Sequence, residues 1–175
     1  MLPDDRLLCH NGRDILLFDL RDAPETDLLA TQRNQPPGQV ALAQLRLYPD
    51  AISQPYLVHD SVRVTVLTDE GVKSLIIPRS GSVPQTMDCV DLLSESIFNS
   101  GTHVGYDRAV ICRFPVMSML QYAWPEDHSS LVLPQKSTIQ TQYWSDILFD
   151  ESSSRIVIGG GVSMIEAILD LATAA

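Results

Sequence analysis

The chain has 175 residues, of which 45% are hydrophobic and 19% are charged, a balance typical of a globular domain rather than of a disordered or fibrous chain. Its 22 acidic and 12 basic residues give a formal net charge of −10, which repels nucleic-acid backbones and anionic lipid surfaces. We therefore expect no nucleic-acid and no membrane partner. The length is sufficient for one domain over residues 1–175 whose core needs no metal or cofactor.

Cysteine usage and the N-terminus indicate the compartment. Cys9, Cys89 and Cys112 lie far apart and form no C-x-x-C pair. The first residues lack the positive charge and the apolar run of a secretory signal peptide. No stretch of about 18 apolar residues is long enough to span a bilayer. The expectation is a soluble, intracellular protein of the cytoplasm or nucleus.

The clearest local pattern predicts a β-hairpin over residues 5–20. Asn11 and Gly12 separate two apolar runs, and this pair tolerates the positive φ angles of a type I′ turn. Both runs are apolar on consecutive residues, which is typical of a sheet covered on both faces. Prolines and polar residues then predict a long surface connection over residues 21–39.

A second series of strands follows this connection. Val62, Val64 and Val66 alternate, so they share one face of a strand. The segment Asp69 to Gly71 predicts a hairpin loop of three to five residues with its glycine in the left-handed conformation. The strands expected here cover residues 40–48, 56–59, 61–68 and 72–77.

Residues 86–98 fit no single element. Their apolar positions have helical spacing, and Thr86 is a residue type that caps helices. Helix and loop both remain open for this segment. The positions with that spacing are Met87, Val90, Leu93 and Ile97.

Apolar runs separated by polar turns continue to the end of the chain. Their recurrence at roughly 8–12 residues is typical of all-β domains, and units of about forty residues approach the ~40–45 residues of a four-stranded propeller blade. We predict an all-β, antiparallel, propeller-like array of about four blades, complete or incomplete, with a β-sandwich as the alternative. The later strands are expected at residues 103–114, 116–124, 131–133, 138–142, 145–149 and 155–158.

Three segments have a strand-turn-strand pattern: residues 2–20, 104–111 and 149–159. They resemble the C-terminal β-propeller-like (WD40-like) region of fungal F-box-type proteins, which are candidate substrate receptors of cullin-RING ubiquitin ligases. The resemblance implies a scaffold that presents a protein-binding surface and brings no catalytic residue. The F-box helices that would dock a ligase adaptor are not recognised in this sequence.

A glycine-rich segment near the C-terminus suggests a rival function. Residues 155–171 are similar to the strand-glycine-helix opening of FAD- or NAD-binding domains, where Gly159 and Gly161 would fill the first two glycine positions. Met164 stands at the third position, where its side chain would push the helix away from the strand. The acidic ribose ligand should lie about 20 residues further on, beyond Ala175. A dinucleotide-binding enzyme fragment is therefore the alternative rather than the preferred function.

Other candidate chemistry is weaker. His59, Asp60 and Ser61 have the residue types of a serine-hydrolase triad, but adjacent residues on a strand point to opposite faces. The remaining histidines lack the spacing of metal ligands, and the acidic pairs lack a calcium-loop pattern. We expect ordinary strand-end or loop positions for His10, His103 and His128, and solvated turns for Asp4-Asp5, Glu126-Asp127 and Asp150-Glu151.

The aromatic residues late in the chain are candidate protein-binding anchors, because Trp and Tyr are enriched in binding hot spots. Core packing between sheets is the competing and preferred role for such residues. The candidates are Tyr122, Trp124, Tyr143 and Trp144.

Taken together, these patterns predict a non-catalytic protein-protein interaction module with no cofactor and no metal. Its partner is expected to be another protein, and the resemblance suggests the substrate-recruiting part of an F-box-type receptor. A dinucleotide-binding fragment and a degenerate structural remnant are the alternatives.

Overall fold

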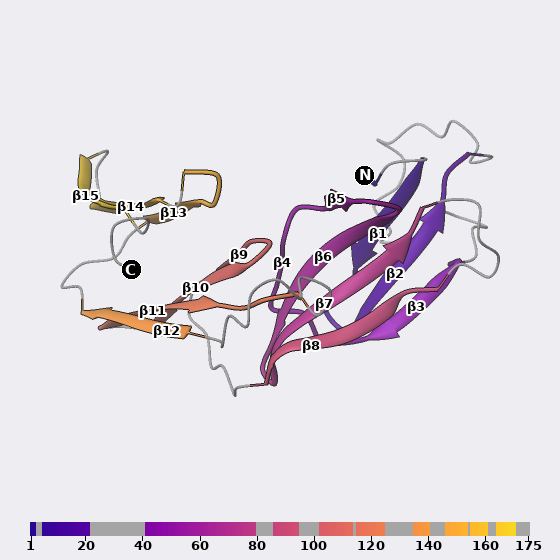
Figure 1. Ribbon diagram of the computed structural model, residues 1–175, viewed down its shortest axis with the longest axis horizontal. Helices are drawn as coiled ribbons and strands as arrows, with labels where there is room; N and C mark the ends of the chain where they lie inside the picture. The colour runs from indigo at the N-terminus through magenta and orange to yellow at the C-terminus, as the bar shows by residue number, and fades with distance from the viewer. Residues whose placement is uncertain are drawn as a thin grey trace.

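The computed structural model of the chain describes residues 1–2, 5–21, 41–79, 86–94, 102–113, 115–124, 135–140, 146–153, 155–160 and 164–170. Every helix or strand assigned in this part of the chain is a strand, and neighbouring strands pair antiparallel (Figure 1). No helix in it is long and apolar enough to cross a membrane. The all-β antiparallel class predicted from the sequence is confirmed.

The described strands form four sheets that succeed one another along the chain. Sheet I has the order β1 (Arg6–His10), β2 (Asp14–Asp19) and β3 (Ala43–Arg46). Sheet II has the order β4 (Ala51–Ile52), β6 (Ser61–Thr68), β7 (Gly71–Pro78) and β8 (Asp88–Ser94), and β5 (Tyr56–Val58) also pairs with β6.

In sheets III and IV, each strand pairs with the strand that follows it in the chain. Sheet III has the order β12 (Gln135–Gln140), β11 (Val116–Gln121), β10 (Arg108–Arg113) and β9 (Thr102–Val104). Sheet IV has the order β13 (Asp146–Asp150), β14 (Arg155–Gly160) and β15 (Met164–Asp170). The first strands of the four sheets begin 44 to 51 residues apart, somewhat more than the units of about forty residues that the polar interruptions in the sequence predict.

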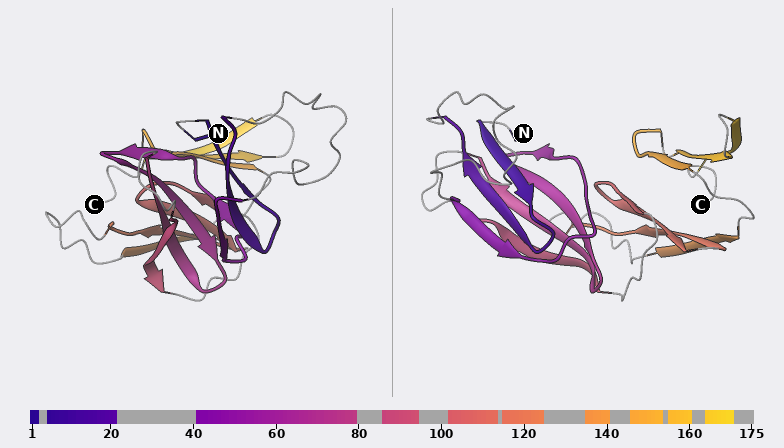
Figure 2. Two further views of the ribbon diagram at one scale, coloured as in Figure 1. Left: turned by 90° about the vertical axis from the view of Figure 1, so that its right-hand side faces the viewer. Right: turned by 180° about the vertical axis from the view of Figure 1, so that it is seen from behind.

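Three hydrophobic clusters join the sheets in chain order. One cluster packs β2 of sheet I against β6 and β7 of sheet II. A second packs sheet II against β10 and β11 of sheet III, and a third packs the other side of sheet III against β13 and β14 of sheet IV. The arrangement is an open stack of four sheets and not a two-sheet sandwich, with sheets I and IV at opposite ends (Figures 1 and 2).

The alternating direction of successive side chains in the central strands makes this stacking possible. In β6, Val62, Val64 and Val66 belong to the cluster with sheet I, whereas Leu67 belongs to the cluster with sheet III. In β10, Ala109 and Ile111 face sheet II, and the residues between and after them belong to the cluster with sheet IV. Because a strand directs successive side chains to opposite faces, a strand in the middle of the stack buries consecutive residues, as β6 does from Val62 to Thr68.

The predicted hairpin over residues 5–20 is present, but its turn differs from the prediction. β1 and β2 pair from Arg6↔Asp19 to His10↔Ile15. Gly12 has a φ of 85°, whereas Asn11 does not have a positive φ, so a type I′ turn with Asn11 in a central position is wrong. The Asn11 side chain instead accepts hydrogen bonds from the amides of Arg13 and Asp14, at 3.0 and 2.7 Å.

The loop between β6 and β7 is shorter than predicted. Thr68 pairs directly with Gly71, which leaves two loop residues rather than three to five. Gly71 has a φ of 140°, a conformation that side-chain-bearing residues rarely adopt. The Thr68 hydroxyl donates to the Gly71 carbonyl at 3.2 Å and accepts from the Glu70 amide at 3.3 Å.

The two interpretations offered for residues 86–98, helix and loop, are wrong for the part that the structure describes. Asp88 to Ser94 form strand β8 on the edge of sheet II. The pairing with β7 shifts between Val72 and Lys73, and the resulting β-bulge leaves Leu92 as an extra residue. Leu92 and Leu93 therefore both contact the second cluster, which breaks the alternation that would have identified the strand. Ile97 lies outside the described residues.

The glycine-rich segment does not open a helix. Met164 to Asp170 form strand β15, which pairs antiparallel with β14. A dinucleotide-binding unit needs a helix there, because the helix N-terminus and its backbone amides bind the pyrophosphate. Gly161 lies outside the described residues, but the geometry on which the dinucleotide alternative depends is replaced by a hairpin.

The stacking order predicts which leucine stabilises the array. Leu75 is 0% exposed between sheets I and II, so Leu75→Ala should lower the free energy of unfolding by about 2–5 kcal/mol. Leu57 is 55% exposed on β5, and Leu57→Ala should change it by no more than about 0.5 kcal/mol. Urea unfolding of both variants measures the difference, and equal effects would contradict the stacking of sheets I and II.

Candidate functional site

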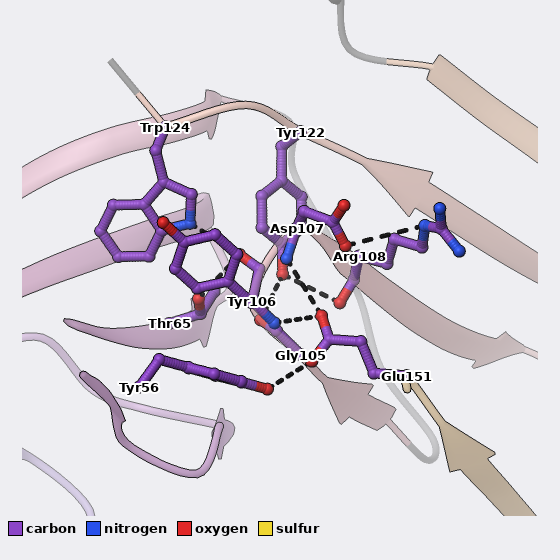
Figure 3. A network of polar contacts seen from close by, with 9 residues as sticks. All are labelled: Tyr56, Thr65, Gly105, Tyr106, Asp107, Arg108, Tyr122, Trp124 and Glu151. Atoms are coloured by element: carbon purple, nitrogen blue, oxygen red, sulfur yellow. Dashed lines mark hydrogen bonds and ion pairs between the residues drawn. The ribbon is translucent and has the colours of Figure 1, made fainter. Parts of the chain in front are cut away.

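The side chain of Glu151 connects three sheets. Glu151 follows β13 directly, and its carboxylate extends from sheet IV into the turn between β9 and β10 of sheet III (Figure 3). Oε1 accepts hydrogen bonds from the amides of Tyr106 and Asp107, the latter at 3.1 Å. Oε2 accepts a hydrogen bond from the hydroxyl of Tyr56, which belongs to sheet II. One carboxylate thus satisfies donors that come from positions far apart in the sequence.

The turn that receives Glu151 is held by backbone and aromatic groups. The Gly105 amide donates to the carbonyl of Arg108 at 2.8 Å, and the indole nitrogen of Trp124 donates to the carbonyl of Tyr106 at 2.8 Å. The Tyr122 hydroxyl lies 2.9 Å from the carbonyl oxygens of both Gly105 and Arg108, so it can donate to either. A Cβ at residue 105 would overlap the Glu151 carboxylate, so glycine at this position allows that side chain to approach the turn closely.

Aromatic rings pack around the same turn. The rings of Tyr106 and Trp124 stack with centroids 5.0 Å apart and an interplanar angle of 16°, and Tyr56 meets Tyr106 edge to face at 5.1 Å. The guanidinium of Arg63 lies 4.8 Å from the Trp124 ring centroid and donates to the Tyr106 hydroxyl at 2.8 Å. These contacts fix the orientation of the aromatic side chains.

Two of the four aromatic residues considered as protein-binding anchors lie in this cluster and are buried. Tyr122 is 1% exposed and Trp124 is 2% exposed, so their rings pack in the core and offer no surface to a partner. An anchor role for these two is therefore wrong, and the competing core role describes them. Tyr143 and Trp144 lie outside the described residues.

Burial and the Glu151 charge shift the titration of the surrounding groups. Burial, followed by the hydrogen bond to Glu151, raises the pKa of Tyr56 well above its usual range. Burial and the nearby Glu151 charge likewise raise the pKa of Tyr122. Burial raises the pKa of Asp107, an effect that the adjacent Arg108 opposes and Glu151 reinforces.

A cavity of about 290 Å³ adjoins the Glu151 carboxylate. Its walls come from sheets II, III and IV, so it lies at the junction of the three. Among the described wall residues, those with polar side chains are Gln54, Tyr56, His103 and Glu151. The remaining wall residues are Ala51, Ile52, Val104, Gly105 and Phe149.

The other sequence candidates occupy turns. His59 has a φ of 51° and forms, with Asp60, the two-residue turn between β5 and β6. The Ser61 hydroxyl donates to the Val58 carbonyl at 3.1 Å, so these three residues do not form a catalytic triad. Asp150 accepts hydrogen bonds from the hydroxyls of Ser152 and Ser153 at 2.7 and 2.6 Å, as a solvated turn residue does.

No group of three or more His, Cys, Asp or Glu residues in the described ranges could hold a metal ion. Asp4, Glu126, Asp127 and His128 lie outside those ranges. His10 is exposed at the end of β1, and His103 lines the cavity described above.

A second surface with binding character is the outer face of sheet IV, which faces away from the cluster shared with sheet III. Leu148 pairs with Val157, and Val157 pairs with Ile168, so the three form one row across β13, β14 and β15. Leu148 is 66% exposed and Ile168 is 58% exposed. We name this row the outer apolar row.

Sequence patterns missed Glu151 and the cavity. The expectation of a solvated turn at Asp150-Glu151 describes Asp150 but is wrong for Glu151, whose carboxylate contacts sheets II and III. The partners of Glu151 lie 44 to 95 residues away, and no local spacing indicates such contacts. The one sequence feature that could have suggested a close approach is the isolated Gly105 within the strand predicted over residues 103–114.

The network predicts a large effect of removing the Glu151 carboxylate. Glu151→Ala leaves the Tyr106 and Asp107 amides without this acceptor, and should lower the free energy of unfolding by about 1–3 kcal/mol. Glu70, whose side chain is 74% exposed in an ion pair with Lys73, provides the control. Glu70→Ala should change stability by no more than about 0.5 kcal/mol in the same urea titration, and a similar loss in both variants would contradict the network.

The raised pKa of Tyr56 predicts a loss of stability in alkali. Above pH 10, the tyrosine of the unfolded chain ionises while the folded chain keeps the proton, so the unfolded state binds fewer protons and stability falls as pH rises. Tyr56→Phe should flatten this slope, whereas Tyr48→Phe, at a 53% exposed position, should leave it unchanged. Thermal unfolding between neutral pH and pH 11 measures the slopes, and equal slopes for wild type and Tyr56→Phe would contradict the assignment.

Comparison of the chain with protein-family models, with curated proteins and with solved structures finds no match. The resemblance to fungal F-box-type proteins is therefore supported only by the three sequence segments named above.

Proposed function

We propose that this chain is a non-catalytic protein-protein interaction module whose outer apolar row contacts a partner protein. The single observation that carries the proposal is the exposure of Leu148 and Ile168 on one face of the last sheet. Contiguous exposed apolar residues with a polar rim are typical of protein interaction sites. The row is flanked by exposed Asp150 and Arg155, which supply such a rim.

The apolar row is rigidly supported from behind. Ile156 is fully buried and Ile158 is 5% exposed, and both pack against sheet III on the inner face of β14. A partner that covers the row would therefore meet a preorganised surface and would lose little entropy in ordering it. Burying an apolar side chain of this size contributes roughly 1.5–3 kcal/mol relative to leaving it in water.

The polar cluster around Glu151 supports a non-catalytic role. Its carboxylate, its tyrosine hydroxyl and its indole nitrogen are engaged in hydrogen bonds that hold the turn of Gly105 to Arg108. A catalytic acid or base has to exchange protons with a substrate, whereas these groups satisfy buried backbone donors and acceptors.

The finer proposal is that the chain is the substrate-recruiting part of an F-box-type ubiquitin ligase receptor. Its support is the resemblance of the three sequence segments to the propeller-like region of fungal F-box-type proteins, together with the open array of four sheets. A full-length protein carrying this chain should then co-purify with a cullin-RING ligase adaptor, and the protein held by the outer apolar row should be a ubiquitylation substrate.

The double variant Leu148→Asp with Ile168→Asp tests the interaction surface. Each aspartate places a charge on the row, and a partner would have to desolvate it, so binding should fall at least about tenfold. Leu57→Asp is the matched control, because Leu57 is similarly exposed but lies on β5 of sheet II. Proteins captured by the tagged wild-type chain are quantified by mass spectrometry, and the strongest is purified and titrated against all three proteins by calorimetry.

A purified partner that binds the wild type and the Leu57→Asp control equally, and the double variant at least tenfold more weakly, supports the proposal. Equal binding to the double variant overturns it, as does the absence of any partner in the titration. Light scattering on the wild type excludes one further explanation. A dimer that the double variant abolishes would make the row a contact between copies and would also overturn the proposal.

A further inference from the structure

The cavity at the junction of sheets II, III and IV has walls suited to a cation. Its lining includes one carboxylate, from Glu151, and no lysine or arginine among the described residues. No described lysine or arginine forms an ion pair with that carboxylate. An anionic ligand would be repelled from this site, whereas a cation would gain a charge-assisted hydrogen bond.

The hydrogen-bond inventory of Glu151 leaves room for one more donor. Each carboxylate oxygen offers two acceptor sites. Oε1 accepts from the amides of Tyr106 and Asp107, and Oε2 accepts from the Tyr56 hydroxyl within the described chain. The second site on Oε2 is therefore open to a ligand, and fixed donors hold the carboxylate in place before the ligand arrives.

The two cations nearest to this network are engaged elsewhere. The Arg63 guanidinium lies over the Trp124 ring and donates to the Tyr106 hydroxyl. The Arg108 side chain lies 3.7 Å from the Asp107 carboxylate.

The remaining walls fit a planar cation on an aliphatic stem. Tyr56 and Phe149 provide aromatic rings, which attract guanidinium groups through cation–π contacts. Ala51, Ile52 and Val104 provide an apolar surface against which methylene groups can pack. The volume of about 290 Å³ lies at the small end of the range for ligand sites, and a guanidinium is less strongly hydrated than an ammonium.

We propose that this cavity binds the guanidinium group of an arginine side chain, presented by a partner polypeptide, with Glu151 as its counter-ion and Gln54 and His103 on the polar wall. The site is separate from the outer apolar row. It depends on the proposed function only for the source of the arginine, since a partner chain and the free amino acid carry the same guanidinium chemistry.

The test uses three small probes and the intact chain. N-acetyl-arginine amide represents an arginine within a polypeptide, free arginine represents the amino acid, and N-acetyl-citrulline amide is the uncharged analogue of the same shape. Binding is followed by NMR shifts of the Gly105 amide and the Ala51 methyl group and by ligand-induced rises in melting temperature. The blocked arginine should bind at least about tenfold more tightly than the blocked citrulline, as expected for one charge-assisted hydrogen bond.

Variants then assign the binding to the cavity. Glu151→Gln removes the charge and should weaken the blocked arginine about tenfold, whereas Asp150→Asn removes the neighbouring exposed charge and should change affinity no more than about twofold. Gln54→Trp, at an exposed wall position, should block the cavity without removing Glu151. This variant keeps the test valid if Glu151→Gln unfolds the chain.

Equal binding of the arginine and citrulline probes overturns the proposal, and so does full arginine affinity in Gln54→Trp. Free arginine that binds at least tenfold more tightly than the blocked form would overturn the polypeptide source. None of the three probes contacts the outer apolar row, so failure here leaves the proposed function standing. Conversely, loss of the partner interaction in the Leu148/Ile168 double variant leaves the arginine site unaffected.

Discussion

The structure depends on sheets II and III being buried on both faces. Val64 of β6 is 1% exposed against sheet I, while Leu67 of the same strand is fully buried against sheet III. Burial on both sides removes more side-chain surface from water per strand than a one-sided sheet would, and in β6 it includes the polar side chains of Arg63 and Thr65. It also commits each sheet to a neighbour on either side, and this requirement produces a stack rather than an isolated sheet.

The same constraint explains why the ends of the stack differ from its middle. Sheet IV packs Ile156 and Ile158 against sheet III, but its opposite face keeps the alternation of β13 and β14 with Leu148 and Val157 turned outward. A strand that needed only one buried face would be expected to carry polar residues there. The apolar composition of this face connects the architecture directly to the proposed interaction.

Sequence patterns predicted the features that depend on local periodicity. The hairpin around Asn11-Gly12, the valine face of β6 and a regular succession of sheets follow from alternation and turn chemistry, and the structure contains all three. The prediction for residues 86–98 failed because a β-bulge at Leu92 disturbs the alternation of buried and exposed side chains. Such a bulge depends on the pairing with the neighbouring strand. Tyrosine and tryptophan occur both in protein cores and in binding surfaces, so residue type alone does not show that Tyr122 and Trp124 are buried.

The Glu151 site could not be predicted for a different reason. Its contacts join Tyr56, Tyr106 and Glu151, whose separations of 45 and 95 residues have no periodic signature. The resemblance to propeller-like regions, which stays a proposal, contains no information about this junction. Long-range polar contacts of this type become visible only when the sheets are placed in space.

One of those contacts has a mechanical consequence. In a stack, each layer normally contacts only the layers next to it, and the terminal layer can detach while the others persist. The hydrogen bond from the Tyr56 hydroxyl to Glu151 instead links sheet IV to sheet II, past the intervening sheet. Detachment of the last layer therefore also releases a group that belongs to the centre of the array. This hydrogen bond therefore couples the unfolding of the C-terminal sheet IV to that of sheet II, two layers away.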